Sequence, residues 1–156
     1  TKALAEEILA DATTCYLWRL RVPFNNMADN RNILNKWMTY DTLLDATNSL
    51  SQVDEFARAC YECFDKKIPF GTYNMTNPGS ITTREAVELI KKYATSDVAS
   101  KEFKFFANED EFMKTAAKAR RSSCVLNSDK RESVGVHMTE VHEAVELALK
   151  NWKASV

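Results

Sequence analysis

The sequence predicts a mixed α/β fold, and two observations support this. Apolar runs typical of strands alternate along the chain with segments whose apolar residues recur at helical spacing. Signals for tight β-hairpins are few, so we expect strands joined by helical crossovers. The chain has 156 residues, 45% of them hydrophobic, which is enough for one domain with a packed core.

The predicted elements follow in chain order. An amphipathic helix over 1–13 places Leu4 and Ile8 on its apolar face. The nearly continuous apolar run 14–22 predicts a strand covered on both faces, which Pro23 ends. The remaining predicted helices span 32–40, 49–67, 82–94, 109–119 and 139–153, and the remaining strands span 42–47, 70–76 and 103–106.

Two of these helices carry specific signals. Thr82 and Glu85 form the S/T-x-x-E capping box at the start of the helix over 82–94. In the helix over 49–67, Cys60 and Cys63 have Cys-x-x-Cys spacing. A zinc site would need further cysteines or nearby histidines, and a redox pair would be expected at a helix start. Both cysteines are in phase with the apolar residues of their helix, so we expect core packing.

The composition excludes several classes of function. Twenty-one basic residues nearly cancel 22 acidic ones, and a net charge of −1 gives no attraction toward nucleic acid or a membrane surface. No apolar run approaches the ~20 residues that a membrane span requires. Four scattered cysteines do not make a disulfide scaffold, so we expect a reducing, cytoplasmic location. None of the three glycines has the spacing of a phosphate-binding loop.

Two polar loops are candidates for a ligand site, and each has an alternative interpretation. Arg120 and Arg121 could clamp a phosphate, or they could be a solvated basic helix end. The amides of Asn25, Asn26 and Asn32 follow the predicted strand over 14–22, where open α/β sheets bind ligands. They could bond sugar hydroxyls, or the loop could be an ordinary connection. These residues alone leave both questions open.

The order of several motifs resembles a known family. The motifs are TKALAEEIL, CYLWRLRVPF, SLSQVDEFARACYECF, GTYNMTNPGSITTREAVELI and RRSSCVLNSDK. Together they resemble the C-terminal half of extended short-chain dehydrogenases/reductases that act on nucleotide sugars, such as the dTDP-4-dehydrorhamnose reductases and the UDP-4-keto-6-deoxyglucose epimerase-reductases. The resemblance implies the C-terminal part of a Rossmann-type fold that binds NAD or NADP, with a smaller substrate-binding lobe. It assigns residues 1–75 to the Rossmann-type core and 76–156 mainly to that lobe.

The resemblance also implies site residues. Lys2 would be the lysine of a catalytic Tyr-x-x-x-Lys motif whose tyrosine would precede the chain, so we expect a C-terminal portion of a longer enzyme. Lys2 would also bind the cofactor, together with the stretch Arg21, Val22 and Pro23. The residues expected to bind the nucleotide sugar are Asn25, Asn26, Asn32, Lys36 and Arg121.

The implied function is nucleotide-sugar binding within an NAD(P)-dependent reductase, epimerase or dehydratase, with 4-keto-6-deoxy sugar chemistry of rhamnose biosynthesis favoured. The portion alone would be inactive. A homodimer through the first helix is a further expectation. The alternative is a non-catalytic relative that serves as a regulatory or binding subunit.

Overall fold

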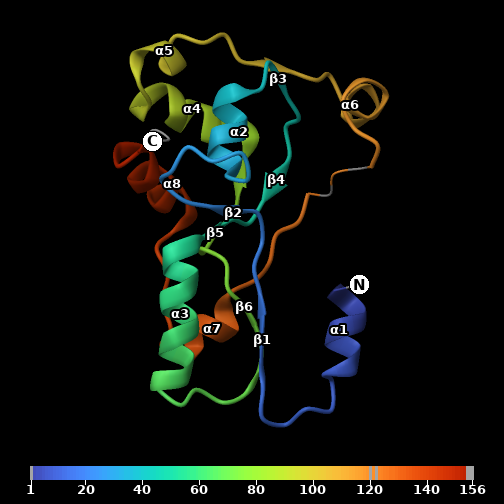
Figure 1. Cartoon of the computed structure of the whole chain (residues 1–156), viewed down its shortest axis with the longest axis vertical. Helices are drawn as coiled ribbons and strands as arrows, with labels where there is room; N and C mark the ends of the chain where they lie inside the picture. Colours follow the sequence, from blue (N-terminus) through green and yellow to red (C-terminus); the bar gives the residue numbers. More distant parts are fainter. Residues whose placement is uncertain (1, 120, 122, 154–156) are drawn as a thin grey trace.

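A computed structural model describes residues 2–119, 121 and 123–153, and it has the predicted α/β character (Figure 1). The helices are α1 (Lys2–Ile8), α2 (Ile33–Thr39), α3 (Val53–Asp65), α4 (Thr83–Tyr93), α5 (Ser96–Ala99), α6 (Glu109–Thr115), α7 (Asp129–Ser133) and α8 (Val141–Lys150). The strands are β1 (Tyr16–Arg19), β2 (Pro23–Phe24), β3 (Thr42–Leu43), β4 (Thr47–Asn48), β5 (Ser51–Gln52), β6 (Gly71–Asn74), β7 (Ile81–Thr82) and β8 (Lys104–Phe105).

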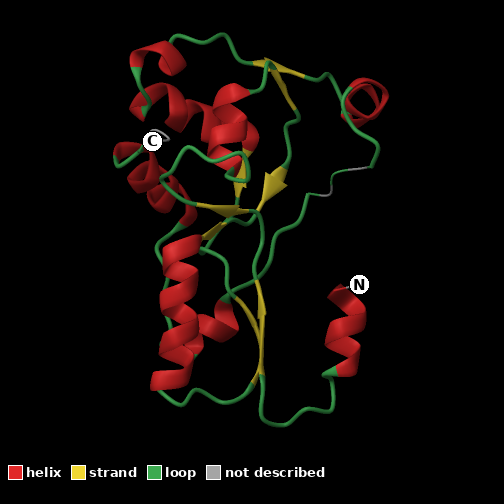
Figure 2. Ribbon diagram, viewed as in Figure 1, coloured by secondary structure: helices red, strands yellow, loops and turns green. Residues whose placement is uncertain are grey.

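The strands pair mostly in parallel, as expected from the lack of hairpin signals. β1 pairs with β6, β2 with β5 and β3 with β8, all parallel, whereas β4 and β7 are antiparallel. Figure 2 shows that these short ladders are separated by long loops and flanked by helices. The chain returns to the partner strand through helices in the parallel pairs, so the crossover prediction is confirmed.

Two groups of buried side chains form the core. The larger group lies where α2, α4 and α8 meet near β2 and β5, and it includes Leu34, Ile90 and Val145. The smaller group lies between α3, β6 and α7, and it includes Cys63 and Tyr73. Residues from before and after position 75 contribute to each group. The division of the chain at residue 75 therefore stays a prediction.

The first helix stands apart from both groups. α1 has no buried residue, and Figure 1 shows it beside β1, on the side away from α3. Glu6 of α1 forms an ion pair with Arg19 of β1, whose Nε donates at 2.9 Å. Leu4 and Ile8, predicted to share an apolar face, are 58% and 73% exposed.

The capping-box prediction is confirmed, and core packing is confirmed for Cys63. At the start of α4 the Thr82 hydroxyl accepts from the Glu85 N–H at 3.1 Å, and the Glu85 carboxylate accepts from the Thr82 N–H at 2.7 Å. On α3, Cys63 is fully buried and Cys60 is partly buried, and neither forms a disulfide. Burial, together with the neighbouring Cys63, raises the pKa of the Cys60 thiol to about 12, which leaves it unreactive.

Two further findings concern metal binding and membrane-spanning helices. Among the residues that the structure describes, no group of three or more His, Cys, Asp or Glu side chains could hold a metal ion. None of the described helices is long and apolar enough to cross a membrane.

Candidate functional site

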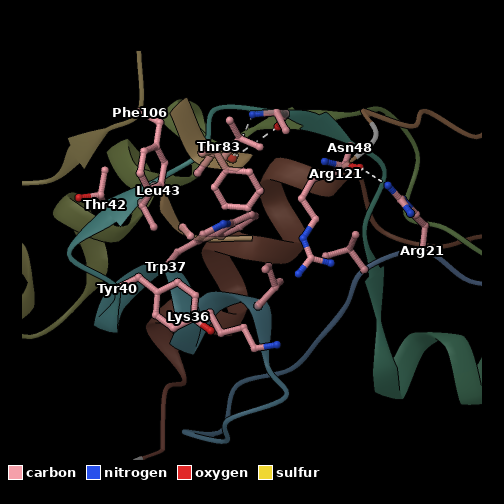
Figure 3. Close-up of a pocket in the computed structure, with 16 residues that line it drawn as sticks. Arg21, Lys36, Trp37, Tyr40, Thr42, Leu43, Asn48, Thr83, Phe106 and Arg121 are labelled. Atoms are coloured by element: carbon pink, nitrogen blue, oxygen red, sulfur yellow. Dashed lines mark hydrogen bonds between the residues drawn. The ribbon is translucent and has the colours of Figure 1, made fainter. Parts of the chain in front are cut away.

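A cavity of about 510 Å³ lies between α2, the β3–β4 segment and α6 (Figure 3). Its walls come from segments far apart in the sequence: the end of β1, α2, the β3–β4 segment, the start of α4, and the stretch from β8 to Arg121. The lining includes Val22, and its charged, amide and aromatic residues are Arg21, Lys36, Trp37, Tyr40, Asn48, Phe106, Phe112 and Arg121.

One side of the cavity carries positive charge. Figure 3 shows Arg21 and Arg121 near Asn48, with Lys36 below them. The Arg21 Nη2 donates to the Asn48 Oδ1 at 2.8 Å, which holds the guanidinium at the wall. None of the described residues that line the cavity is Asp or Glu. Three cations without a carboxylate among the lining residues make this side attractive to an anion such as a diphosphate.

The other side of the cavity is aromatic. Trp37 and Tyr40 come from α2 and its C-terminal end, and Phe106 follows β8 (Figure 3). Phe106 is held in an edge-to-face contact with Phe112 of α6, with ring centroids 5.4 Å apart. Flat aromatic rings of this kind can stack on a nucleobase or cover the apolar face of a sugar.

Local sequence explains how the cationic side is positioned. Asn32 caps α2 by accepting from the Leu34 N–H at 3.1 Å, and the helix then presents Lys36 and Trp37 to the cavity. Arg121 lies three residues before Cys124, whose N–H donates to the Thr47 carbonyl at 3.1 Å. That bond ties the Arg121 segment to β4, beside the cavity.

The backbone at Val22 is unusual. Its φ of 40° places a β-branched residue in the left-handed region, and a proline follows it. A β-branched residue such as valine rarely adopts a positive φ. A following proline restricts the preceding residue further, because it favours extended conformations there. Strain of this kind persists only where the surroundings impose it, and it concentrates at functional sites.

Some of the predicted site residues line the cavity, and others lie elsewhere. The structure brings Arg21, Val22, Lys36 and Arg121 together around the cavity, although they are far apart in the sequence. Pro23 starts β2 and is exposed. Arg120 lies outside the described residues.

The three asparagines do not line this cavity. The Nδ2 of Asn32 donates to the Asn25 Oδ1 at 2.9 Å and to the Met27 carbonyl at 2.8 Å, so the amide holds its own loop. The Oδ1 of Asn25 also accepts from the Met27 N–H. Asn26 donates to the Asn151 carbonyl at 3.0 Å and lines a second cavity of about 390 Å³. Their amides are engaged with this chain, and a sugar-binding role for them stays a prediction.

Lys2 is also absent from the lining of the cavity. It is the first residue of α1 and is exposed. Its predicted catalytic role has no partner group among the described residues that line the cavity.

Sequence reasoning missed part of the site. Asn48 and the aromatic residues Trp37, Tyr40 and Phe106 were not singled out. For Trp37 a signal existed, because it adjoins Lys36 on the same short helix. Asn48 reaches the cavity through the pairing of β4 with β7, and Phe106 through the pairing of β3 with β8. No local sequence pattern predicts either pairing.

Comparison with known proteins identifies relatives of the chain. No family model matches the chain. Over 104 residues it is 31% identical to a bifunctional dTDP-4-dehydrorhamnose 3,5-epimerase/dTDP-4-dehydrorhamnose reductase of Arabidopsis thaliana. Over 94 residues it is 32% identical to a trifunctional UDP-glucose 4,6-dehydratase/UDP-4-keto-6-deoxy-D-glucose 3,5-epimerase/UDP-4-keto-L-rhamnose-reductase of the same plant. The chain is a homologue of these nucleotide-sugar reductases and epimerases.

The homology covers only part of each relative. The matched stretches are 66% and 60% of this chain but only 34% and 14% of the two plant enzymes. The chain therefore corresponds to a portion of these enzymes, and the resemblance seen in the sequence is confirmed.

Solved structures confirm the fold. A UDP-rhamnose synthase from Acanthamoeba polyphaga mimivirus superposes with a TM-score of 0.81 at 20% identity, covering 96% of this chain and 50% of that one. A dTDP-4-dehydrorhamnose reductase from Bacillus anthracis, solved in complex with NADP, gives a TM-score of 0.64 at 16% identity, covering 85% and 47%. The chain therefore shares the Rossmann-type fold of these two proteins over the covered part.

Proposed function

We propose that this chain is the nucleotide-sugar-binding portion of an NAD(P)-dependent enzyme that reduces or epimerises a 4-keto-6-deoxy hexose linked to UDP or dTDP, as in rhamnose biosynthesis. The observation that supports this most strongly is the cavity itself, which has cations on one side and aromatic rings on the other. A nucleoside diphosphate has the complementary arrangement of anion and flat base. The homologues are named for such substrates.

In this proposal the guanidinium of Arg121 and the ammonium of Lys36 bind the diphosphate, because both groups donate charge-assisted hydrogen bonds. Arg21 joins them, since its side chain lies at the same cavity and is held by Asn48. Trp37 and Tyr40 cover the base or the sugar. Asn25, Asn26 and Asn32 support the loop that carries α2.

This chain would supply only some of the contacts to an NAD or NADP cofactor. Val22 at the cavity wall would lie against a nicotinamide, with Pro23 next to it in the sequence. Lys2, which does not line the cavity, would hold the nicotinamide ribose. When bound, NAD or NADP would supply or accept the hydride. The residues of this chain would orient the sugar and neutralise its diphosphate, and the remaining cofactor contacts would come from the part of the enzyme outside this chain.

Three further features belong to the proposal. Four cysteines without a disulfide fit the reducing cytoplasm. The exposed apolar face of α1, with Leu4 and Ile8, fits a homodimer interface, which size-exclusion chromatography of Ile8→Glu would test. The balanced charge of the chain gives no reason to expect nucleic acid as a partner.

Calorimetric titration of the chain with UDP-glucose and dTDP-glucose tests the proposal. We expect heat on titration, and a dissociation constant raised about tenfold to a hundredfold in Arg121→Gln, since one charge-assisted hydrogen bond contributes about 1.5–3 kcal/mol. Arg58→Gln is the matched control, because Arg58 lies on α3 and not at the cavity. Absence of heat with both nucleotides, or equal losses in both variants, would contradict the proposal.

A further inference from the structure

The end of the β1–β6 ladder is interrupted at one specific position. Arg19 pairs with Asn74, and the Met75 N–H donates to the Arg19 carbonyl at 2.7 Å. In a regular parallel ladder the next bond would run from the Arg21 N–H to the Met75 carbonyl, because the bonds are evenly spaced and alternate between the strands.

The Ser51 hydroxyl takes the place of that bond. Its Oγ accepts from the Arg21 N–H at 3.0 Å and donates to the Met75 carbonyl at 2.7 Å. Ser51 is 1% exposed and belongs to β5, which pairs with β2. One buried side chain therefore satisfies both backbone groups that the two strands would otherwise satisfy between themselves.

The insertion coincides with the point where the chain changes direction toward the cavity. Directly after Arg21, Val22 adopts its left-handed φ of 40°, and its carbonyl accepts from the Ser51 N–H at 3.5 Å. The same segment supplies Asn48, whose Oδ1 accepts from the Arg21 guanidinium at 2.8 Å. The backbone and the side chain of Arg21 are thus both held by residues 48–51.

We propose that Ser51 is a positioning residue for the cationic side of the cavity: its hydroxyl separates β1 from β6 after Arg19, and so directs Arg21 and Val22 into the cavity wall. The proposal rests on the proposed function in so far as Arg21 binds the ligand's anion. Without the hydroxyl, the Arg21 N–H and the Met75 carbonyl would pair directly and β1 would extend by one bond. The Arg21 side chain would then leave the orientation that Asn48 supports.

The first test needs no ligand. Through-hydrogen-bond NMR couplings in the wild-type chain should be absent between the Arg21 amide nitrogen and the Met75 carbonyl carbon, and present between Met75 and Arg19. In Ser51→Ala the coupling between Arg21 and Met75 should appear. A coupling between Arg21 and Met75 in the wild-type chain would overturn the proposal, and this result does not depend on whether the variant folds.

The second test is UDP binding by calorimetry. Ser51→Ala should raise the UDP dissociation constant about tenfold, which corresponds to about 1.4 kcal/mol, whereas Ser51→Thr keeps the hydroxyl and should restore binding. Ser49→Ala is the matched control: Ser49 is equally buried in the same segment, but its Oγ accepts from the Leu126 N–H. It should lose stability and keep the UDP affinity.

The outcomes separate the two proposals. If the wild-type chain binds no UDP, the proposed function fails, and the NMR couplings still decide whether Ser51 separates the strands. If the wild type binds and Ser51→Ala binds equally well, with unchanged Arg21 resonances, the positioning role of Ser51 is wrong. Equal losses of affinity in Ser51→Ala and Ser49→Ala would also overturn it, because the loss would then be a general effect of removing a buried hydroxyl.

Discussion

Replacing Arg131 with methionine tests how the segment after β6 is held against α7. Arg131 of α7 is 0% exposed, and its Nη1 and Nη2 donate to the carbonyls of Val136 and Thr76 at 2.6 and 3.0 Å. It also pairs with Glu132 at 2.8 Å. Burial lowers the pKa of the guanidinium, and the carboxylate of Glu132 opposes this shift.

The expected magnitude follows from these contacts. Methionine fills similar space but donates to neither carbonyl, and it removes one of the two partners of Glu132, the other being His137. Breaking a buried charged network of this kind costs about 3–5 kcal/mol. A domain is typically stable by only about 5–15 kcal/mol, so the loss would be a large fraction of the total. With a urea m-value of about 2 kcal/mol/M, the unfolding midpoint should fall by roughly 2 M.

Urea unfolding followed by circular dichroism measures this loss. Arg58→Met is the control, because the Arg58 side chain is 48% exposed and its pair with Glu62 lies on the surface of α3. The control should lose less than about 1 kcal/mol. Similar midpoints for Arg131→Met and Arg58→Met would refute the reasoning that the buried guanidinium ties α7 to the segment after β6.

Three further predictions concern titration, reactivity and binding. Hydrogen bonds from the Thr82 N–H and hydroxyl hold the pKa of Glu85 below its usual 4.5. The ionised Glu85 carboxylate therefore stabilises the fold above pH 4.5, and this stabilisation is lost as the pH falls through the lower pKa of the folded state. The urea midpoint of Glu85→Gln should therefore depend less on pH between about 6 and 3 than that of the wild type, and equal dependence would contradict this. Because burial and Cys63 raise the pKa of Cys60 to about 12, iodoacetamide at about pH 8 should leave Cys60 unmodified in the folded chain by peptide mass spectrometry, and rapid labelling there would refute its burial. Trp37→Leu keeps apolar packing but loses the stacking surface, so the UDP dissociation constant should rise by roughly tenfold, from about 1–3 kcal/mol of base stacking, and an unchanged constant would place the base elsewhere.

The sequence predicts the features that depend on near neighbours. The α4 capping box needs only Thr82 and Glu85, three residues apart, and the burial of Cys63 follows from its phase on α3. The parallel sense of pairing, as between β1 and β6, follows from apolar runs separated by helices, whereas the choice of partner strand does not. These signals are local or periodic, so they can be recognised without knowledge of the tertiary structure.

The asparagine loop shows where sequence reasoning reached its limit. Asn32 is suited both to a sugar ligand and to a helix N-cap, and in the structure it is the N-cap of α2. Its position directly before a helical apolar pattern was a signal for that role. An amide can both donate and accept, and this chemistry does not by itself say whether its partner is a ligand or the chain's own backbone.

Other parts of the site depend on contacts between distant segments. Asn48 reaches Arg21, and Ser51 reaches both Arg21 and Met75, only after β5 has docked beside the end of β1. The left-handed backbone of Val22 depends on the same docking, because nothing in a valine–proline sequence favours it. No spacing rule in the sequence contains these contacts.

Chemical-shift mapping of UDP binding to the isotope-labelled chain tests the central claim most directly. We expect saturable shifts in the resonances of Arg21, Lys36, Trp37 and Arg121, which lie together around the cavity. Shifts confined to Asn26 and the second cavity, or no shifts at millimolar UDP, would contradict the claim that this cavity binds a nucleoside diphosphate.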